Sequence, residues 1–201
     1  MAAAMIDYSM LGKLMVEGTG AEAFLQRMCT NNMAIKPGRV AYTLMLNDRG
    51  GIESDVTVAR HATDSFMVMS SISHPRRDYL HLRDAIQSGE NVQLRDVTAS
   101  FGVLGLMGPK SRELLDSVSD VDLSNEAFRF NSLQSFHIGH ASVMAQRLSY
   151  SGELDWEIFV TPDFAEHVFE VLMEAGKAHG LRLFGGEALN ALRIEKGFVH
   201  W

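Results

Sequence analysis

The stretch that decides the fold is Asn47-Asp48-Arg49-Gly50-Gly51-Ile52-Glu53-Ser54-Asp55-Val56-Thr57-Val58, which follows the apolar run Val40–Leu46. Asparagine, aspartate and two glycines supply the positive-φ conformations of a reversing turn, so this stretch predicts a β-hairpin. After the turn, alternate side chains point to opposite faces, and Glu53, Asp55 and Thr57 share one face. This acidic face is either simply solvated or part of a functional site, and the pattern alone favours solvation.

A gapless internal repeat relates the two halves of the chain. Residues 11–25 align with residues 101–115, and each copy reads as a strand, a glycine turn and a helix. The aligned residues include Gly12 with Gly102, Gly18 with Gly108, and Phe24-Leu25 with Leu114-Leu115. A duplication of two units predicts a single folded domain rather than a solenoid.

A second glycine turn with an acidic strand follows the second copy. In residues 150–158, Glu153, Asp155 and Glu157 share one strand face. Each half therefore places a carboxylate on a strand just after a glycine turn, Asp55 in the first half and Glu157 in the second. We infer two interlocked, pseudo-twofold halves with a site between them.

Composition limits the class of protein. With 46% hydrophobic residues, the 201-residue chain can bury one core or two small halves that share one. Eighteen basic and 25 acidic residues give a net charge of −7 without a basic tract, so no nucleic-acid surface is expected. No apolar run reaches membrane-spanning length, and the N-terminus is not a secretory signal. The single Cys29 excludes an intramolecular disulfide, and we expect a cytoplasmic protein.

Strands and helices are mixed within each half. Helices are expected after Thr19, with Glu22 completing a capping box, from Pro75 (capped by Ser73) to Gly89, and over residues 111–118, 161–180 and 187–196. Further strands are expected at residues 65–71, 133–138, 141–148 and 154–160. The mixture predicts the α+β class, as two interlocked pseudo-symmetric halves of antiparallel sheet plus helices.

We expect one domain over residues 1–201, with halves of roughly 1–98 and 99–201. The chain ends on Phe198-Val199-His200-Trp201, and terminal aromatic residues usually pack against something. We therefore expect the chain to be part of a longer protein.

Several patterns of known sites do not fit. Gly102, Gly105 and Gly108 are each three residues apart, which differs from the G-x-G-x-x-G spacing of a dinucleotide-binding loop. In addition, Gly108 aligns with Gly18 and so belongs to the repeated turn. His137 and His140 have no third ligand at a useful spacing, so no metal site is expected. Cys29 near a helix end fits a buried small apolar residue better than a nucleophile.

Three other polar side chains keep two interpretations each. Tyr150 and Tyr42 either contact a ligand or only pack. Arg193, with Glu195, fits an ion pair or a capping set better than a ligand contact. Two carboxylates facing one cavity would suit a ligand with a guanidine-like N–H edge, or one that develops positive charge.

Motifs in the same order as in a known family run through nearly the whole chain. They are Asp7-Tyr8-Ser9-x-x-Gly12-Lys13-x-x-Val16-x-Gly18, Tyr42-x-x-x-Leu46-Asn47-x-x-Gly50-Gly51-Ile52-x-x-Asp55, Gly108-Pro109-Lys110, Tyr150-Ser151-Gly152-Glu153-x-x-x-Glu157 and Leu192-Arg193-Ile194-Glu195. Together they resemble the tetrahydrofolate-binding aminomethyltransferase family. That family includes the T-protein of the glycine cleavage system and the folate modules fused to dimethylglycine and sarcosine dehydrogenases. Residues 51–58 and 195–198 look closer to the dehydrogenase-linked modules.

The resemblance implies a folate-binding core that transfers a one-carbon unit to tetrahydrofolate and yields 5,10-methylenetetrahydrofolate. Asp55 would be the catalytic acid beside the N5/N10 region, where it stabilises a cationic nitrogen or steers its protons. Glu157 would bind the N–H edge of the pterin, and Tyr150 would line the same pocket. The remaining folate-binding candidates are Tyr42, Ser70 and Arg193. The implied donor is an aminomethyl group on a lipoyl carrier protein, or an iminium made by a fused flavin domain.

Three departures from the family pattern concern the pocket. Leu189-Asn190 stands where T-proteins carry an arginine, which weakens the anchor for the folate tail. Ser70 stands where they often have an asparagine. The family's C-terminal β-barrel is absent from these 201 residues, and without it the isolated chain can be inactive.

Two other functions stay open. One is a non-catalytic folate-binding module of the iron–sulfur and tRNA-modification type, although its Lys-Gly-Cys-Tyr motif differs from Lys196-Gly197-Phe198-Val199 here. The other is a folate-dependent demethylase acting on a sulfur-bound methyl group. The sequence does not select the donor or the oligomeric state.

Overall fold

The computed structural model describes residues 2–199 and 201. The strands are β1 (Ala3–Asp7), β2 (Gly12–Glu17), β3 (Val40–Leu46), β4 (Ile52–Ala62), β5 (Ser65–Ser70), β6 (Gln93–Asp96), β7 (Gly102–Met107), β8 (Ser132–Ile138), β9 (Ala141–Arg147), β10 (Asp155–Val160) and β11 (Leu181–Leu183). The helices are α1 (Ala21–Met28), α2 (Pro75–Ala85), α3 (Ser111–Asp116), α4 (Pro162–Gly176) and α5 (Gly186–Lys196), with 3-10 turns η1 (Thr98–Ser100) and η2 (Lys177–His179). The strands expected from the hairpin and acidic-turn patterns are confirmed, within one residue at most ends.

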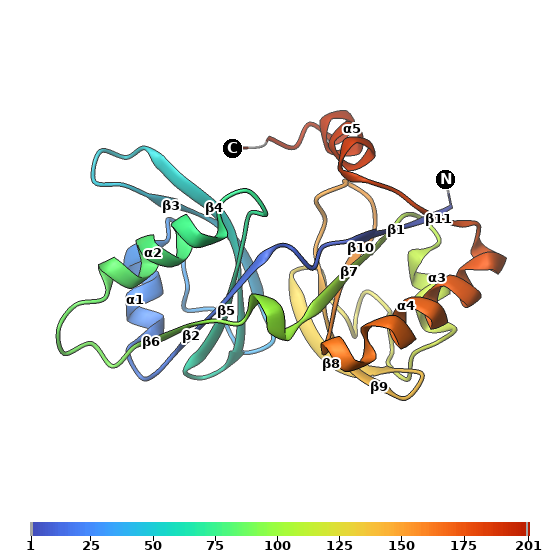
Figure 1. Ribbon diagram of the computed structural model, residues 1–201, viewed down its shortest axis with the longest axis horizontal. Helices are drawn as coiled ribbons and strands as arrows, with labels where there is room; N and C mark the ends of the chain where they lie inside the picture. Colours follow the sequence, from blue (N-terminus) through green and yellow to red (C-terminus); the bar gives the residue numbers. More distant parts are fainter. Residues whose placement is uncertain (1, 200) are drawn as a thin grey trace. The chain divides into compact units, whose positions relative to one another are not determined.

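The elements form two compact units, one of Met1–Ser9 with Ala99–His200 and one of Met10–Thr98 with Trp201. The sheet of the first unit has the strand order β11-β1-β7-β10-β9-β8, and that of the second has the order β3-β4-β5-β2-β6 (Figure 1). Neighbouring strands are antiparallel except β11, which is parallel to β1. The predicted α+β class is confirmed.

The predicted duplication is visible in the element order, because β2-α1-β3-β4-β5-α2 is repeated by β7-α3-β8-β9-β10-α4. β1 precedes β2 in the chain but pairs with β7, whereas β6 precedes β7 but pairs with β2. The strand that precedes each copy of the repeat thus pairs with the other copy, β1 with β7 and β6 with β2, which is the predicted interlocking. The patterns did not predict β1, β6 or β11, because strands of three to five residues show too little alternation.

The two repeated glycines adopt the same backbone conformation. Gly18 has φ +117° and Gly108 has φ +111°, a region that side chains with a Cβ rarely enter. A Cβ at Gly18 would also lie 2.2 Å from the Asn91 carbonyl oxygen. The repeated strand–glycine turn–helix pattern therefore rests on backbone geometry at these positions.

Two predicted helix caps are wrong. α1 begins at Ala21 after Gly20, which forms no side-chain cap, and Thr19 Oγ1 instead accepts a hydrogen bond from Asn91 Nδ2 at 2.9 Å. α2 is preceded by His74 rather than Ser73, and it ends at Ala85, before Gly89. Side-chain caps are individually weak, and at α1 tertiary contacts with Asn91 and Arg60 take Thr19 and Glu22, the polar groups that the pattern assigned to capping.

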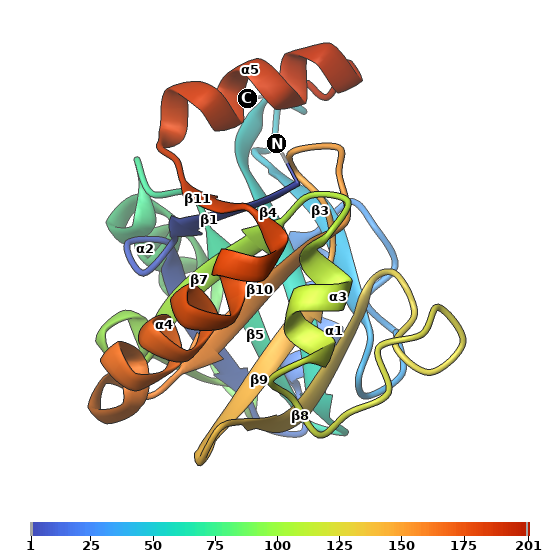
Figure 2. The same cartoon turned by 90° about the vertical axis from the view of Figure 1, so that its right-hand side faces the viewer.

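Helices cover one face of each sheet. In the first unit, α3 and α4 lie on the face that carries Trp156 and Ile158 (Figure 2), and both side chains are fully buried in that core. In the second unit, a separate core joins α1 and α2 to the face with Val56 and Val58. The side chains that alternate with these core residues, Asp155 and Glu157 on β10 and Asp55 on β4, therefore lie on the opposite faces.

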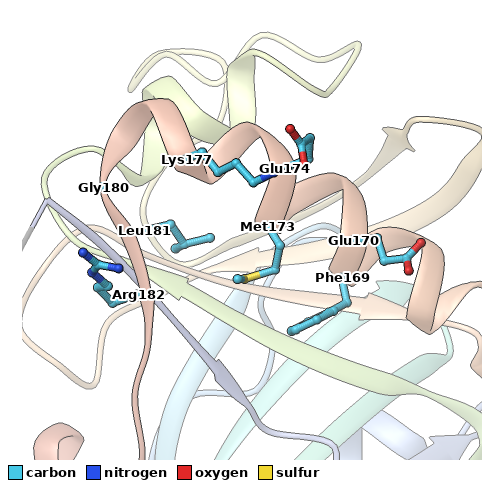
Figure 3. Close-up of a pocket in the computed structure, with 8 residues that line it drawn as sticks. All are labelled: Phe169, Glu170, Met173, Glu174, Lys177, Gly180, Leu181 and Arg182. Carbon is cyan, nitrogen blue, oxygen red and sulfur yellow. Dashed lines mark hydrogen bonds and ion pairs between the residues drawn. The ribbon is translucent and has the colours of Figure 1, made fainter.

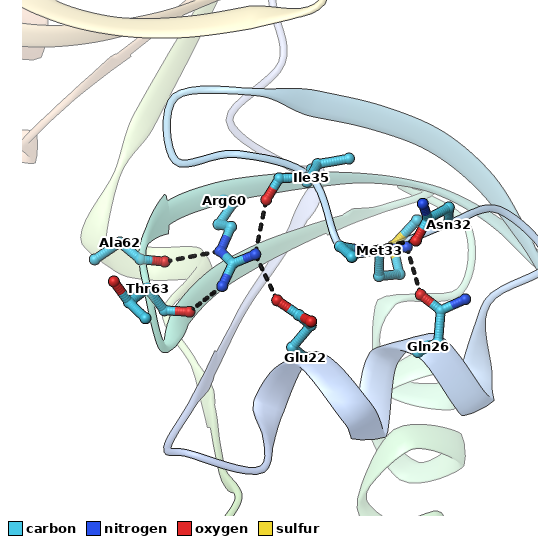
Figure 4. A network of polar contacts seen from close by, with 9 residues as sticks. Glu22, Gln26, Asn32, Met33, Ile35, Arg60, Ala62 and Thr63 are labelled. Carbon is cyan, nitrogen blue, oxygen red and sulfur yellow. Dashed lines mark hydrogen bonds and ion pairs between the residues drawn. The ribbon is translucent and has the colours of Figure 1, made fainter.

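A buried arginine stabilises the second unit (Figure 4). Arg60 Nη1 donates to Glu22 Oε2 at 2.6 Å and to the Ile35 carbonyl at 2.7 Å. Its Nε and Nη2 donate to the carbonyls of Ala62 at 3.2 Å and Thr63 at 2.5 Å. The guanidinium thus links α1, the segment before β3 and the turn between β4 and β5.

Arg60→Met is expected to destabilise the protein by about 2 kcal/mol, because three carbonyls and one carboxylate lose their donor. Chemical denaturation would measure the change in the free energy of unfolding. Arg83→Met is the control, since Arg83 is half-exposed and pairs with the adjacent, exposed Asp84, and it should cost less than about 0.5 kcal/mol. Equal losses in the two variants would contradict the structural role of Arg60.

Candidate functional site

A row of four residues crosses the non-core face of the first unit's sheet. In register, Gln146 on β9 lies opposite Glu157 on β10, Glu157 opposite Gly105 on β7, and Gly105 opposite Ile6 on β1. Residues directly opposite each other in antiparallel strands share a face, with Cβ atoms about 5 Å apart. The row therefore places Glu157 between a buried amide and a glycine.

Glu157 is a carboxyl group in an unfavourable place for a charge. Burial of this side chain, which stays partly exposed, and the nearby carboxylate of Asp155 together raise its pKa to about 7. A carboxyl group that titrates near neutral pH can accept hydrogen bonds as a carboxylate or donate one as an acid. Such groups occur preferentially at functional sites.

Asp155 lies two residues earlier on the same face and is only 6% exposed. Burial raises its pKa to about 6, although hydrogen bonds from Ser151, Ser149 and the Tyr150 backbone oppose this rise. The predicted shared face of Asp155 and Glu157 is confirmed, while Glu153 belongs to the loop before β10. The sequence did not single out Asp155 as a site residue.

Tyr8 also belongs to this cluster and was missed. A Cβ at Gly105 would lie 2.6 Å from Tyr8 Cε2, so the glycine leaves the space that the ring occupies. Burial raises the pKa of Tyr8, and the charges of Glu157 and Asp155 add to the effect. Tyr150, a predicted ligand contact, lies in the same apolar cluster. The sequence feature that could have indicated this contact is Gly105, a glycine in the middle of an apolar strand, because such a glycine leaves space for another group.

Gln146 is the third residue that the sequence did not reveal. It is fully buried, and neither Nε2 nor Oε1 has a hydrogen-bond partner among the described residues. A buried amide without partners is costly, since its desolvation is not compensated. The structure therefore places an unsatisfied amide directly beside Glu157.

The second unit holds the other predicted residues. On β4, Asp55 is partly buried, and Tyr42 on β3 donates its hydroxyl to Asp55 Oδ2 at 3.1 Å. Ser70 ends β5 opposite Gly12, where its Oγ is buried without a partner among the described residues. A Cβ at Gly12 would lie 2.4 Å from that oxygen. The structure thus brings Tyr42 and Asp55 together.

The interpretation of Asp55 and Glu157 as mirrored residues is wrong. The sheet orders make β4 the equivalent of β9, and β5 the equivalent of β10. Asp55 lies on β4 and Glu157 on β10, so the two acids occupy different strands of the duplicated unit. The prediction that both acids face one shared site stays a prediction.

Arg193 contributes to the end of α5. Its Nε donates to Asn190 Oδ1 at 2.8 Å and its Nη1 donates to the Phe198 carbonyl at 2.9 Å. Gly197 follows the helix with φ +81°, in the left-handed region that glycine favours. These contacts match the capping interpretation, and folate binding by Arg193 stays a prediction.

A separate hollow of about 740 Å³ lies beside α4 and β11 (Figure 3). Phe169, Met173 and Leu181 give it an apolar floor, and Lys177 pairs with Glu174 at its rim. α4 packs on the Trp156 face, so this hollow is on the other side of the sheet from Glu157. It contains none of the predicted site residues.

Cys29 is a buried, free cysteine. Burial raises the pKa of the Cys29 thiol to about 12, which confirms the prediction of a small buried residue. Among residues 2–199 and 201, no three His, Cys, Asp or Glu side chains gather as a metal site would require. Within the same residues, no helix has the length and apolarity needed to cross a membrane.

Comparison with known proteins identifies the family. The model of the GCVT N-terminal domain matches residues 1–201. The chain belongs to this family. The crystal structure of glycine cleavage system aminomethyltransferase T from Bartonella henselae superposes with a TM-score of 0.84 at 25% identity, over 99% of this chain and 52% of that one. The fold of this aminomethyltransferase structure is thus shared over 99% of the chain.

Curated relatives of the GCVT domain extend beyond it. Aminomethyltransferase of Halothermothrix orenii is 35% identical over 96% of this chain, and mitochondrial dimethylglycine dehydrogenase of Rattus norvegicus is 34% identical over 98%. The chain spans 54% of the former relative and 23% of the latter. The predicted resemblance to aminomethyltransferases and to dimethylglycine and sarcosine dehydrogenases is confirmed.

Proposed function

We propose that this GCVT domain binds tetrahydrofolate and takes part in the transfer of a one-carbon unit to it, with 5,10-methylenetetrahydrofolate as the product. The observation that carries the proposal is Glu157, a carboxyl group raised to a pKa of about 7 on a sheet face with Tyr8 and Tyr150. The names of its relatives, aminomethyltransferase and dimethylglycine dehydrogenase, support the same chemistry.

Glu157 would recognise the pterin. The 2-amino group and ring N–H of a pterin form two parallel donors, and a carboxylate accepts such a pair in bidentate geometry. A ligand that donates two hydrogen bonds also compensates the burial that disfavours the charged form of Glu157. The neighbouring tyrosines provide flat surfaces for a planar ring.

Asp55 would act on the one-carbon unit. Transfer passes through a cationic nitrogen or an iminium carbon, and a nearby carboxylate stabilises that charge. The hydrogen bond from Tyr42 fixes the orientation of the Asp55 carboxylate. We also propose Ser70, whose buried oxygen lacks a partner among the described residues, and Arg193 as folate contacts. The donor would be a lipoyl-bound aminomethyl group or an iminium from a flavin domain.

Glu157→Ala is expected to weaken the binding of 5-formyltetrahydrofolate by about 1.5–3 kcal/mol, because a charge-assisted hydrogen-bond pair is lost. Isothermal titration at pH 8 measures this difference in binding free energy. Glu166→Ala is the control, since this exposed glutamate lies on α4, which covers the opposite face of the sheet. Undiminished affinity in Glu157→Ala would refute the assignment of Glu157, and a wild-type protein that does not bind the ligand would refute the proposed folate function.

A further inference from the structure

The carboxylate of Asp155 is the centre of a small hydrogen-bond network. Its Oδ2 accepts from Ser149 Oγ at 3.0 Å and from the backbone N–H groups of Tyr150 and Ser151, both at 3.1 Å. Ser151 Oγ donates to Asp155 Oδ1 at 2.7 Å. All of these donors belong to the loop between β9 and β10, so one side chain holds the loop against its own strand.

The loop is closed by contacts of its own. Ser149 Oγ accepts from the Gly152 N–H at 2.9 Å, and Ser151 Oγ accepts from the Glu153 N–H at 3.1 Å. Gly152 has φ +86°, and a Cβ there would lie 2.5 Å from the Lys196 side chain of α5. Tyr150 therefore lies between two serines that are tied to Asp155.

Asp155 and Glu157 are neighbours on one strand face, with side chains about 7 Å apart at i and i+2. The charges of Asp155 and Glu157 both act on Tyr8, from the segment after β1, and Tyr150 from the loop acts on Tyr8 as well. The charge of Asp155 also raises the pKa of Glu157. Asp155 thus affects both the position of Tyr150 and the ionisation of Glu157.

We propose that Asp155 is a positioning residue for ligand binding, which holds the Tyr150 loop beside Glu157 so that one planar ligand contacts both. The proposal rests on the folate function proposed above and assigns Asp155 no contact with the ligand. Glu157 accepts hydrogen bonds from the N–H edge of the pterin, and Tyr150 packs against the ring. Asp155 holds the Tyr150 loop at the distance from Glu157 at which one ligand contacts both residues. The charge of Asp155 adds to burial in raising the pH at which Glu157 becomes the carboxylate that the ligand needs.

Two variants separate these effects. Asp155→Asn removes the charge and turns part of the acceptor into a donor that faces the N–H groups of Tyr150 and Ser151. Ser151→Ala keeps the charge but removes the hydroxyl that bonds to Asp155. Glu153→Gln is the control, because it neutralises an exposed carboxylate of the same loop.

The experiment is isothermal titration of 5-formyltetrahydrofolate between pH 5.5 and 8.5, with the melting temperature measured in parallel. Wild-type affinity is expected to rise with pH, with a midpoint near 7, as Glu157 ionises. Asp155→Asn should weaken binding at pH 8 about tenfold and move the midpoint to lower pH, because a like charge is removed. Ser151→Ala should weaken binding about threefold with an unchanged midpoint. The control should match wild type.

A lower melting temperature in Asp155→Asn, with wild-type affinity and midpoint, would show that Asp155 only stabilises the fold and would overturn the proposal. If Asp155→Asn does not fold, wild-type affinity in Ser151→Ala would overturn it instead. Failure of the folate function has a different signature, in which wild type itself does not bind the ligand, and failure of the Glu157 assignment appears as equal affinity in wild type and Glu157→Ala.

Discussion

Asp55→Asn is expected to lower the rate of one-carbon transfer about 100- to 1,000-fold and to change folate affinity by less than about threefold. A neutral amide has nearly the same shape as the carboxylate, but it neither stabilises a cationic nitrogen nor accepts its proton. The hydrogen bond from Tyr42 to Asp55 Oδ2 survives if the amide oxygen takes that place. The rate is measured as formation of 5,10-methylenetetrahydrofolate in a single turnover with a saturating donor.

Two controls separate the charge of Asp55 from its orientation. Asp48→Asn removes an exposed charge from the turn of the same hairpin and should leave the rate unchanged. Tyr42→Phe removes the hydroxyl that orients Asp55 and should lower the rate about tenfold, since orientation contributes less than charge. A wild-type rate in Asp55→Asn, or an equal fall in Asp48→Asn, would exclude Asp55 from the reaction.

The parts of the fold that were predictable are those encoded by local chemistry. The Asn47–Gly51 turn is closed by a hydrogen bond from the Asn47 N–H to the Gly51 carbonyl at 2.9 Å, and Gly50 has φ +77°. Asparagine, aspartate and glycine favour positive φ, so their presence in the sequence predicts such turns directly. The same holds for Gly18 and Gly108, whose shared conformation made the repeat visible.

The missed parts depend on pairing between distant strands. Tyr8 reaches Glu157 only because β1 joins the sheet of β7 and β10, and the short strand β1 gives no sign of that exchange. Gln146 is a neighbour of Glu157 through the register of β9 with β10. A shift of one residue would place it on the core face, so its role follows from register rather than from residue type.

The carboxylate pair shows how a correct repeat can support a wrong equivalence. The alignment of residues 11–25 with 101–115 fixes β2 to β7 and α1 to α3, but it says nothing about the strands that follow. Asp55 was compared with Glu157 because both follow glycine turns. Strand order, which needs the pairing partners, places them on β4 and β10, which are not equivalent. The residue types of a turn therefore predict that a hairpin forms, but they do not predict which strands of the two repeats are equivalent.

Glu157→Gln is expected to stabilise the protein at high pH by up to about 3 kcal/mol and to have little effect below pH 4.5. In the unfolded chain, Glu157 ionises near its ordinary pKa of 4.5, but in the folded protein it ionises near 7. Between these values the folded state keeps a proton that the unfolded state has lost, so the stability from this group falls as pH rises. Glutamine carries no charge at any pH and avoids this loss, and 2.5 pKa units correspond to about 3 kcal/mol.

Urea denaturation at pH 4.5, 6 and 8 tests this expectation, with Glu166→Gln as an exposed control that should change stability by less than about 0.5 kcal/mol at each pH. Parallel stability curves for wild type and Glu157→Gln would show that Glu157 ionises normally in the folded protein. Combined with weaker folate binding in Glu157→Gln, the expected gain would mean that the domain keeps a destabilising carboxylate for its ligand. In that case wild-type protein should also release protons on binding folate near pH 7, since two N–H donors favour the ionised form.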